Sequence, residues 1–102
     1  MSLNAPLLRV PGGTDWVYLF DILTSSAGPG PDATFTQQML ARNRRLFEQA
    51  RAAGGTRYPI GSIPFTHSDW VRQYGDAWAS LTALERRYDP DGMLTPGPGI
   101  LP

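Results

Sequence analysis

The segment Thr14 to Leu23, which reads TDWVYLFDIL, is an almost continuous run of apolar side chains, interrupted by Asp21. Aromatic and branched side chains of this kind favour the pleated surface of a β-strand. One face of such a strand would carry Trp16, Tyr18, Phe20 and Ile22, and the other Val17, Leu19 and Leu23. Because both faces are apolar, the pattern predicts a strand that is covered on both sides.

After the breaker-rich loop SSAGPGPDA, apolar positions change to helical spacing. One stripe holds Met39, Leu40, Asn43, Leu46, Phe47 and Ala50. The helix is expected to begin at either Asp32 or Thr34, and Thr34 with Gln37 three residues later fits a capping box. Gly54-Gly55 is expected to end it, because glycine adopts the left-handed conformation without strain.

The segment Thr56 to Phe65 is expected to be extended, and its prolines restrict it to an edge strand or a loop. Thr66 and Asp69 then fit a second capping box, which predicts a short helix through Trp70 and Tyr74.

Gly75 is expected to close that helix and Asp76 to open another one, which runs to Tyr88. The motif DPDG, Asp89 to Gly92, fits a type I turn, with proline at its second position. Together, these patterns predict an α+β fold with a small antiparallel sheet element and about three helices.

Composition sets limits on the partners and the compartment. The 102 residues include no cysteine and carry a formal net charge of zero. This length suits one small domain. Neutral charge argues against a nucleic-acid partner, and no stretch is apolar over the roughly 18 residues that a membrane span needs. No secretion signal is visible, so the expected compartment is the cytoplasm.

Candidate catalytic chemistry is sparse. His67 is the only histidine, and without cysteine or a second histidine it cannot build a metal site. Asp69 could join it in acid–base chemistry, but a position in the first turn of a helix favours a structural, exposed histidine. The serines have no base nearby in the sequence. The residues alone therefore predict no catalytic residue, no metal site and no complete enzyme.

Three stretches together resemble the carboxyl-terminal part of the flavin-linked oxidases of the cytokinin dehydrogenase group. They are DWVYLFDIL, NRRLFEQARAAGGTRYPIGSIP and DWVRQYGDAWASLTALERRYDPDGMLTPGPGIL. Their order and spacing match over nearly all of the chain. The combination of Tyr88-Asp89-Pro90 with the following Pro-Gly stretch carries most of this resemblance.

The resemblance implies roles for three residues. Tyr58 matches a family tyrosine beside the isoalloxazine ring of FAD, and Pro59 occupies the position of a residue that lines the substrate pocket. Pro98 stands where the family usually has a glutamine, so an amide that can contact the flavin is missing there. The family's flavin-attachment histidine has no counterpart, and His67 is not its equivalent.

The resemblance also implies that residues 1–102 are a single incomplete domain, the carboxyl-terminal piece of a substrate domain whose FAD-binding domain is absent. The intact enzyme would pass a hydride from a C–N bond to FAD, whereas this chain alone is expected to bind no FAD and to be inactive. The alternative is a stand-alone relic that acts as a binding or oligomerising module. Both interpretations predict burial of the apolar strand, in a homo-oligomer or against the missing domain.

Overall fold

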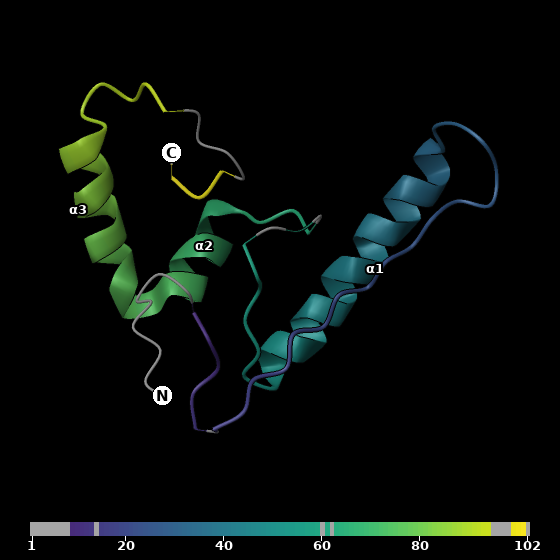
Figure 1. The fold of residues 1–102 in the computed structure, drawn as a ribbon, viewed down its shortest axis with the longest axis horizontal. Helices are drawn as coiled ribbons and strands as arrows, with labels where there is room; N and C mark the ends of the chain where they lie inside the picture. Colours follow the sequence, from purple (N-terminus) through teal and green to yellow (C-terminus); the bar gives the residue numbers. More distant parts are fainter. Residues whose placement is uncertain (1–8, 14, 60, 62, 95–98, 102) are drawn as a thin grey trace. The chain divides into compact units, whose positions relative to one another are not determined.

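A computed structural model describes residues 9–13, 15–59, 61, 63–94 and 99–101. The elements in chain order are α1 (Ala33–Ala52), α2 (His67–Tyr74), the 3-10 turn η1 (Gly75–Ala77) and α3 (Trp78–Tyr88), as Figure 1 shows. None of these helices has the length and apolarity that a bilayer crossing demands.

The chain groups into two compact units. The α1 unit consists of the described residues of Val10–Thr56 and Gly61–Pro64. The α2–α3 unit consists of those of Met1–Arg9, Arg57–Ile60 and Phe65–Pro102. The prediction that residues 1–102 form a single incomplete domain stays a prediction.

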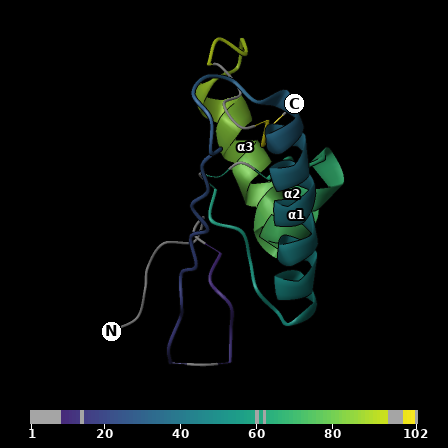
Figure 2. The same ribbon diagram turned by 90° about the vertical axis from the view of Figure 1, so that its right-hand side faces the viewer.

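The predicted α+β fold with a small antiparallel sheet is wrong, because the described part of the chain contains helices and no strand. Residues 15–23 are drawn in Figures 1 and 2 as a thread without regular structure. The large apolar side chains of this thread are exposed, up to 85% for Phe20 and Leu23. A strand needs a neighbouring strand to bind its backbone groups. The segment around Pro59 and Pro64, which the sequence predicts to be extended, would be a poor neighbour, because proline has no N–H to donate.

Helix α1 begins after Asp32, whose Oδ1 accepts a hydrogen bond from the backbone N–H of Phe35 over 2.8 Å. This contact decides between the two predicted start points, and the Thr34–Gln37 capping box is therefore wrong. Thr34 already lies inside the helix, where its backbone belongs to the first turn. One side chain of α1, Phe47, is buried.

Helix α1 ends as the sequence predicted, at the glycine pair. Gly54 has a φ of +86°, and its N–H donates to the carbonyl of Arg51 over 3.0 Å. The N–H of Gly55 donates to the carbonyl of Ala50 over 2.8 Å. These two bonds make up a Schellman motif, which satisfies carbonyl groups that the helix end leaves open.

The predicted capping box at the start of α2 is confirmed. The N–H of Asp69 donates to Thr66 Oγ1, and the N–H of Thr66 donates to Asp69 Oδ2 over 2.9 Å. Gly75, with a φ of +50°, ends α2, and η1 leads directly into α3. After α3, the N–H of Gly92 donates to the carbonyl of Asp89, which closes the predicted turn.

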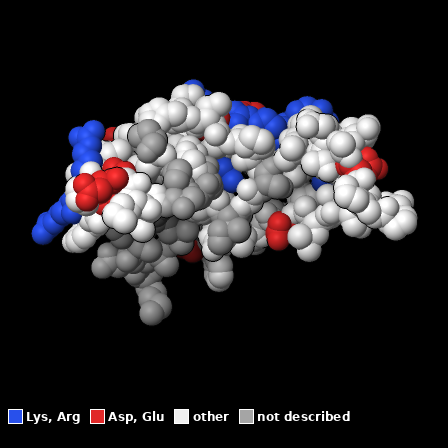
Figure 3. All heavy atoms as spheres, turned by 90° about the horizontal axis from the view of Figure 1, so that it is seen from above, with Lys and Arg blue, Asp and Glu red and all other residues white. Residues whose placement is uncertain are grey.

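Charged residues form no single-sign surface on the face that Figure 3 draws. Basic and acidic side chains lie interspersed among uncharged ones there, consistent with the net charge of zero.

Candidate functional site

A buried arginine lies at the centre of the α2–α3 unit, next to the tyrosine that the resemblance singled out. Arg57 is only 7% exposed. Its guanidinium carbon lies 4.5 Å from the ring centre of Phe65 and 5.0 Å from that of Trp70, which is fully buried. A planar cation placed over aromatic faces is attracted by the ring quadrupole, and this attraction offsets part of the desolvation of the charge.

The aromatic rings around Arg57 form a continuous series along the helices. Trp70, Tyr74 and Trp78 are spaced four residues apart, and successive ring centres are 6.2 Å apart. This spacing puts Trp70 and Tyr74 on one face of α2, and Trp78 begins α3. Phe65 packs edge-on against Trp70 at 4.7 Å. These aromatic side chains pack against one another and so hold the chain around Arg57 in place.

Burial shifts the pKa values of two groups in this cluster. Desolvation lowers the pKa of Arg57, and the nearby Tyr74 opposes this shift. Desolvation raises the pKa of Tyr74, and the positive charge of Arg57 opposes that shift. At neutral pH, Arg57 is a cation and Tyr74 a neutral phenol, so neither group acts as a base there.

The backbone of Arg57 is held by one side chain of α2. The N–H of Arg57 donates to Gln73 Oε1 over 3.0 Å, and Gln73 Nε2 donates to the carbonyl oxygen of Arg57. The Gln73 amide thus binds both polar backbone groups of a single residue, as a neighbouring strand would. We refer to this pair of bonds as the Arg57–Gln73 clamp.

Of the three residues to which the resemblance assigns a role, two come directly after Arg57 in the sequence. Tyr58 is 49% exposed, and Pro59 is half-buried. Pro98 lies outside the described residues. The roles of all three stay predictions. Sequence reasoning missed Arg57 and Gln73, because the partners of the clamp lie 16 residues apart and neither belongs to a recognisable motif.

His67 and Asp69 make no acid–base pair. The N–H and the hydroxyl of Thr66 both donate to Asp69 Oδ2, each over 2.9 Å. His67 is exposed, and its ring packs edge-on against Trp78 at 5.3 Å. His67 therefore lies exposed in the first turn of α2, as the sequence predicted. Among the described residues, no group of acids and histidines could hold a metal ion.

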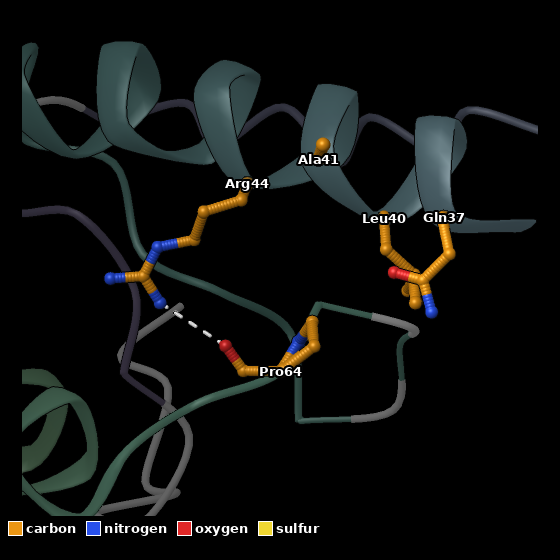
Figure 4. A pocket seen from close by; sticks show the side chains of 5 residues that line it. All are labelled: Gln37, Leu40, Ala41, Arg44 and Pro64. Carbon is orange, nitrogen blue, oxygen red and sulfur yellow. Dashed lines mark hydrogen bonds between the residues drawn. The ribbon is translucent and has the colours of Figure 1, made fainter.

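A shallow hollow in the α1 unit offers little chemistry. Figure 4 shows its lining by Gln37, Leu40, Ala41, Arg44 and Pro64. Its one charged group, the guanidinium of Arg44, donates to the carbonyl of Pro64 over 3.1 Å and pairs with Glu48 at 2.6 Å. A hollow of this kind lacks the acid–base or nucleophilic pair that a catalytic site requires.

Comparison with known families shows which family the chain belongs to. A family model described as cytokinin dehydrogenase 1, FAD and cytokinin binding, matches residues 6–101. The chain belongs to this family. The suspected relationship to cytokinin dehydrogenases is therefore confirmed, and membership implies FAD as the cofactor of the intact enzyme.

Several known proteins are similar to the chain, among them an oxidoreductase and two cytokinin dehydrogenases. An uncharacterized oxidoreductase, ORF5 in the fasciation locus of Rhodococcoides fascians, is 35% identical over 93% of this chain and 20% of its own length. Cytokinin dehydrogenase 8 of Oryza sativa subsp. indica is 31% identical over 91% of the chain and 19% of its own length. Cytokinin dehydrogenase 3 of Oryza sativa subsp. japonica is 32% identical over 89% of the chain and 18% of its own length. No solved structure matches. The chain spans about one fifth of the length of these relatives.

The described residues fit one contact with the FAD of this family. The half-exposed ring of Tyr58 can lie against a flat aromatic ring system, and its backbone neighbour is fixed by the clamp. The proline-interrupted glycine stretches, such as GPGP at 28–31, lack the run of N–H groups that cradles a pyrophosphate. The contact between Tyr58 and FAD stays a prediction.

Proposed function

We propose that this chain is the last fifth of an FAD-dependent oxidoreductase of cytokinin dehydrogenase type, in which Tyr58 lies beside the isoalloxazine ring and Pro59 lines the substrate pocket. The family match over residues 6–101 carries this proposal. When bound, FAD supplies the hydride acceptor for the oxidation of a C–N bond. The structure supports the role of Tyr58 because a half-exposed ring beside a held backbone can serve as a fixed wall.

Tyr58 and Pro59 would act by shape and by exclusion of water. A tyrosine ring offers a large apolar face and a polar tip. Pro59 has no N–H group, so it presents an apolar surface that does not compete for the polar groups of a substrate. Neither residue needs to transfer a proton, which agrees with the prediction that this chain holds no catalytic residue. Pro98, in place of the family glutamine, would contribute no amide hydrogen bond to the flavin.

The rest of the flavoprotein is the partner that we propose for the exposed segment 16–23. Trp16, Tyr18, Leu19, Phe20 and Leu23 are each between 73% and 85% exposed. A group of exposed large apolar side chains of this kind suits an interaction site. A 102-residue polypeptide with this sequence would then neither hold FAD nor turn over. Stoichiometric flavin in that purified polypeptide would contradict the proposal.

The second candidate function is a non-catalytic module that buries the same segment between copies of the chain. The exposure of residues 16–23 favours this candidate as well, because a homo-oligomer would also remove that surface from water. Sedimentation of the isolated polypeptide at high concentration distinguishes the outcomes. A concentration-dependent oligomer supports burial of the segment between copies, and a strict monomer excludes the homo-oligomer.

The role of Tyr58 is tested in the flavin-loaded protein that carries this chain. Tyr58→Ala is expected to shift the flavin absorption spectrum and to lower kcat by about tenfold, since an aromatic contact contributes about 0.5–1.5 kcal/mol. Tyr58→Phe keeps the ring and is expected to stay within about twofold of the unchanged protein. An unchanged spectrum together with unchanged turnover in Tyr58→Ala would overturn the proposed role.

A further inference from the structure

The Arg57–Gln73 clamp controls the peptide bond that leads into Tyr58. The carbonyl oxygen that accepts from Gln73 Nε2 belongs to the peptide group joining Arg57 to Tyr58. The N–H that donates to Gln73 Oε1 belongs to the preceding peptide group. Because peptide groups are planar, two bonds on either side of the Arg57 Cα fix both planes, and with them the direction in which the chain enters Tyr58.

Helix α2 also holds the side chain of Arg57. Trp70, whose ring lies 5.0 Å from the guanidinium carbon, is three residues before Gln73 on this helix. Residues three apart share a helix face. One face of α2 therefore binds the backbone and the side chain of Arg57 together, and this side chain is 7% exposed.

The residue after Tyr58 restricts it from the other side. A residue before proline is confined to extended conformations, because the proline ring clashes with helical ones. Tyr58 thus lies between a clamped residue and Pro59, although its own side chain is 49% exposed. Such an arrangement leaves the ring on the surface and takes away most of the freedom of the backbone that carries it.

We infer that Gln73 is a positioning residue, which acts through the backbone of Arg57 to hold Tyr58 against the flavin. This role rests on the proposed function of Tyr58. An active-site group must be held close to its productive geometry by surrounding contacts, and an error of about 1 Å there reduces the rate strongly. The amide of glutamine suits the task because it both donates and accepts, whereas a glutamate carboxylate only accepts.

The clamp itself is tested by hydrogen exchange of the Arg57 amide, with no reference to activity. Gln73→Ala is expected to lower the protection of this amide by about five- to tenfold, the equivalent of one net hydrogen bond. Gln73→Glu keeps the acceptor for the Arg57 N–H and is expected to retain most of the protection. Gln49→Ala, on the exposed side of α1, is the matched control and should leave it unchanged. Unchanged protection in Gln73→Ala would overturn the inference.

The positioning role is tested by a double-mutant cycle on kcat in the flavin-loaded protein. Gln73→Ala is expected to lower kcat by about fivefold with KM nearly unchanged, and to shift the flavin spectrum in the same sense as Tyr58→Ala. The double variant Gln73→Ala/Tyr58→Ala should equal Tyr58→Ala alone, since without the ring there is nothing to position. A merely structural effect of Gln73 would instead multiply with that of Tyr58.

The outcomes separate this inference from the proposed function. Multiplying effects in the cycle, or normal kcat in Gln73→Ala beside an impaired Tyr58→Ala, would overturn the positioning role and leave the role of Tyr58 standing. Normal turnover together with an unchanged flavin spectrum in Tyr58→Ala would overturn the proposed role of Tyr58 and the positioning role with it, whatever the hydrogen exchange shows. Gln73→Glu is the control for loss of the fold, because glutamate has nearly the same size as glutamine and is not expected to disturb the packing of α2.

Discussion

Two tryptophans of this chain lie in opposite environments. Trp70 is fully buried in the α2–α3 unit, whereas Trp16 in the α1 unit is 76% exposed. Trp70 finds its ring partners Phe65 and Tyr74 within five residues along the chain. Trp16 lies in a segment whose pattern calls for a neighbouring strand, and the described residues contain no strand. Partners nearby in the sequence are thus enough to bury a helical residue, whereas an extended segment needs a strand from a distant part of the sequence to cover its side chains.

The difference in energy between the two regions is large. An aromatic side chain buries about 150–250 Å², and each Å² of apolar surface contributes roughly 25 cal/mol when it leaves water. The exposed side chains of residues 16–23 forgo this contribution, while those around Trp70 obtain it. We therefore expect the two regions to respond very differently to the same substitution.

The largest expected effect is that of Trp70→Ala. Removal of a fully buried tryptophan destabilises a fold by about 3–5 kcal/mol, and here it also removes one of the two rings over Arg57. Chemical denaturation of the chain, followed by far-UV circular dichroism, measures the change. Trp16→Ala is the matched control and is expected to change the free energy of unfolding by less than about 0.5 kcal/mol.

The control also sharpens the comparison. A cost of several kcal/mol for Trp16→Ala would mean that residues 16–23 are buried in solution, and sedimentation would then show whether a second copy covers them. A small cost for Trp70→Ala would contradict the central place of this residue in the α2–α3 unit.

Helix boundaries were the most predictable part of the fold. The Thr66–Asp69 capping box and the Gly54-Gly55 terminator each act within a few residues of the chain, so their sequence signals are complete by themselves. The strand at residues 14–23 was wrong for the opposite reason. The pattern of apolar residues indicates which faces of a strand are apolar, but it does not indicate whether a neighbouring strand is there to bind the backbone.

The candidate site shows the same division. Tyr58 and Pro59 were found through the family resemblance, which reads positions along the sequence. The Arg57–Gln73 clamp joins residues 16 apart through a backbone that carries no sequence signal. Burial of Arg57 was also unpredictable, because arginine is usually exposed and its ring partners, Phe65 and Trp70, lie beyond a proline-rich segment.

The next effect in size concerns alkaline pH and compares two tyrosines of the two regions. Burial raises the pKa of Tyr74 above its ordinary value, with the charge of Arg57 opposing the shift. Above a pH of about 10, the unfolded chain loses this proton while the folded chain keeps it. Stability is therefore fully present below pH 10 and falls as the pH rises towards the raised pKa, by at most about 1.4 kcal/mol per pH unit.

Tyr74→Phe is expected to flatten this alkaline loss of stability, because phenylalanine has no proton to release. Tyr18→Phe, in the thread, where the tyrosine is 78% exposed, is the matched control for loss of a phenol hydroxyl, and it should change the free energy of unfolding at pH 8 by less than about 0.5 kcal/mol. Thermal or urea unfolding between pH 8 and 11.5 measures both variants. Equal profiles for Tyr74→Phe and the unchanged protein would show that Tyr74 does not titrate differently in the folded state.

The smallest expected effect concerns Asp89, in a segment that combines features of both regions. Met93 and Leu94 are 83% and 71% exposed, much like the thread. Their backbone is held, however, because the N–H of Met93 donates to Asp89 Oδ1 over 2.7 Å and that of Leu94 to Asp89 Oδ2 over 2.9 Å. This use of both carboxylate oxygens gives the aspartate of the Tyr88-Asp89-Pro90 motif a physical role: it presents two exposed aliphatic side chains on a fixed turn.

Asp89→Asn leaves one oxygen to accept and turns the other position into a donor that faces an N–H group. We expect the amide protection of Leu94 or Met93 to fall by about fivefold, the equivalent of roughly 1 kcal/mol, with little change in the unfolding of α3. Asp91→Asn, an exposed change in the same turn, is the matched control. If Asp91→Asn lowered the protection as much as Asp89→Asn, the negative charge of the turn, and not the two hydrogen bonds to Asp89, would hold the backbone of Met93 and Leu94.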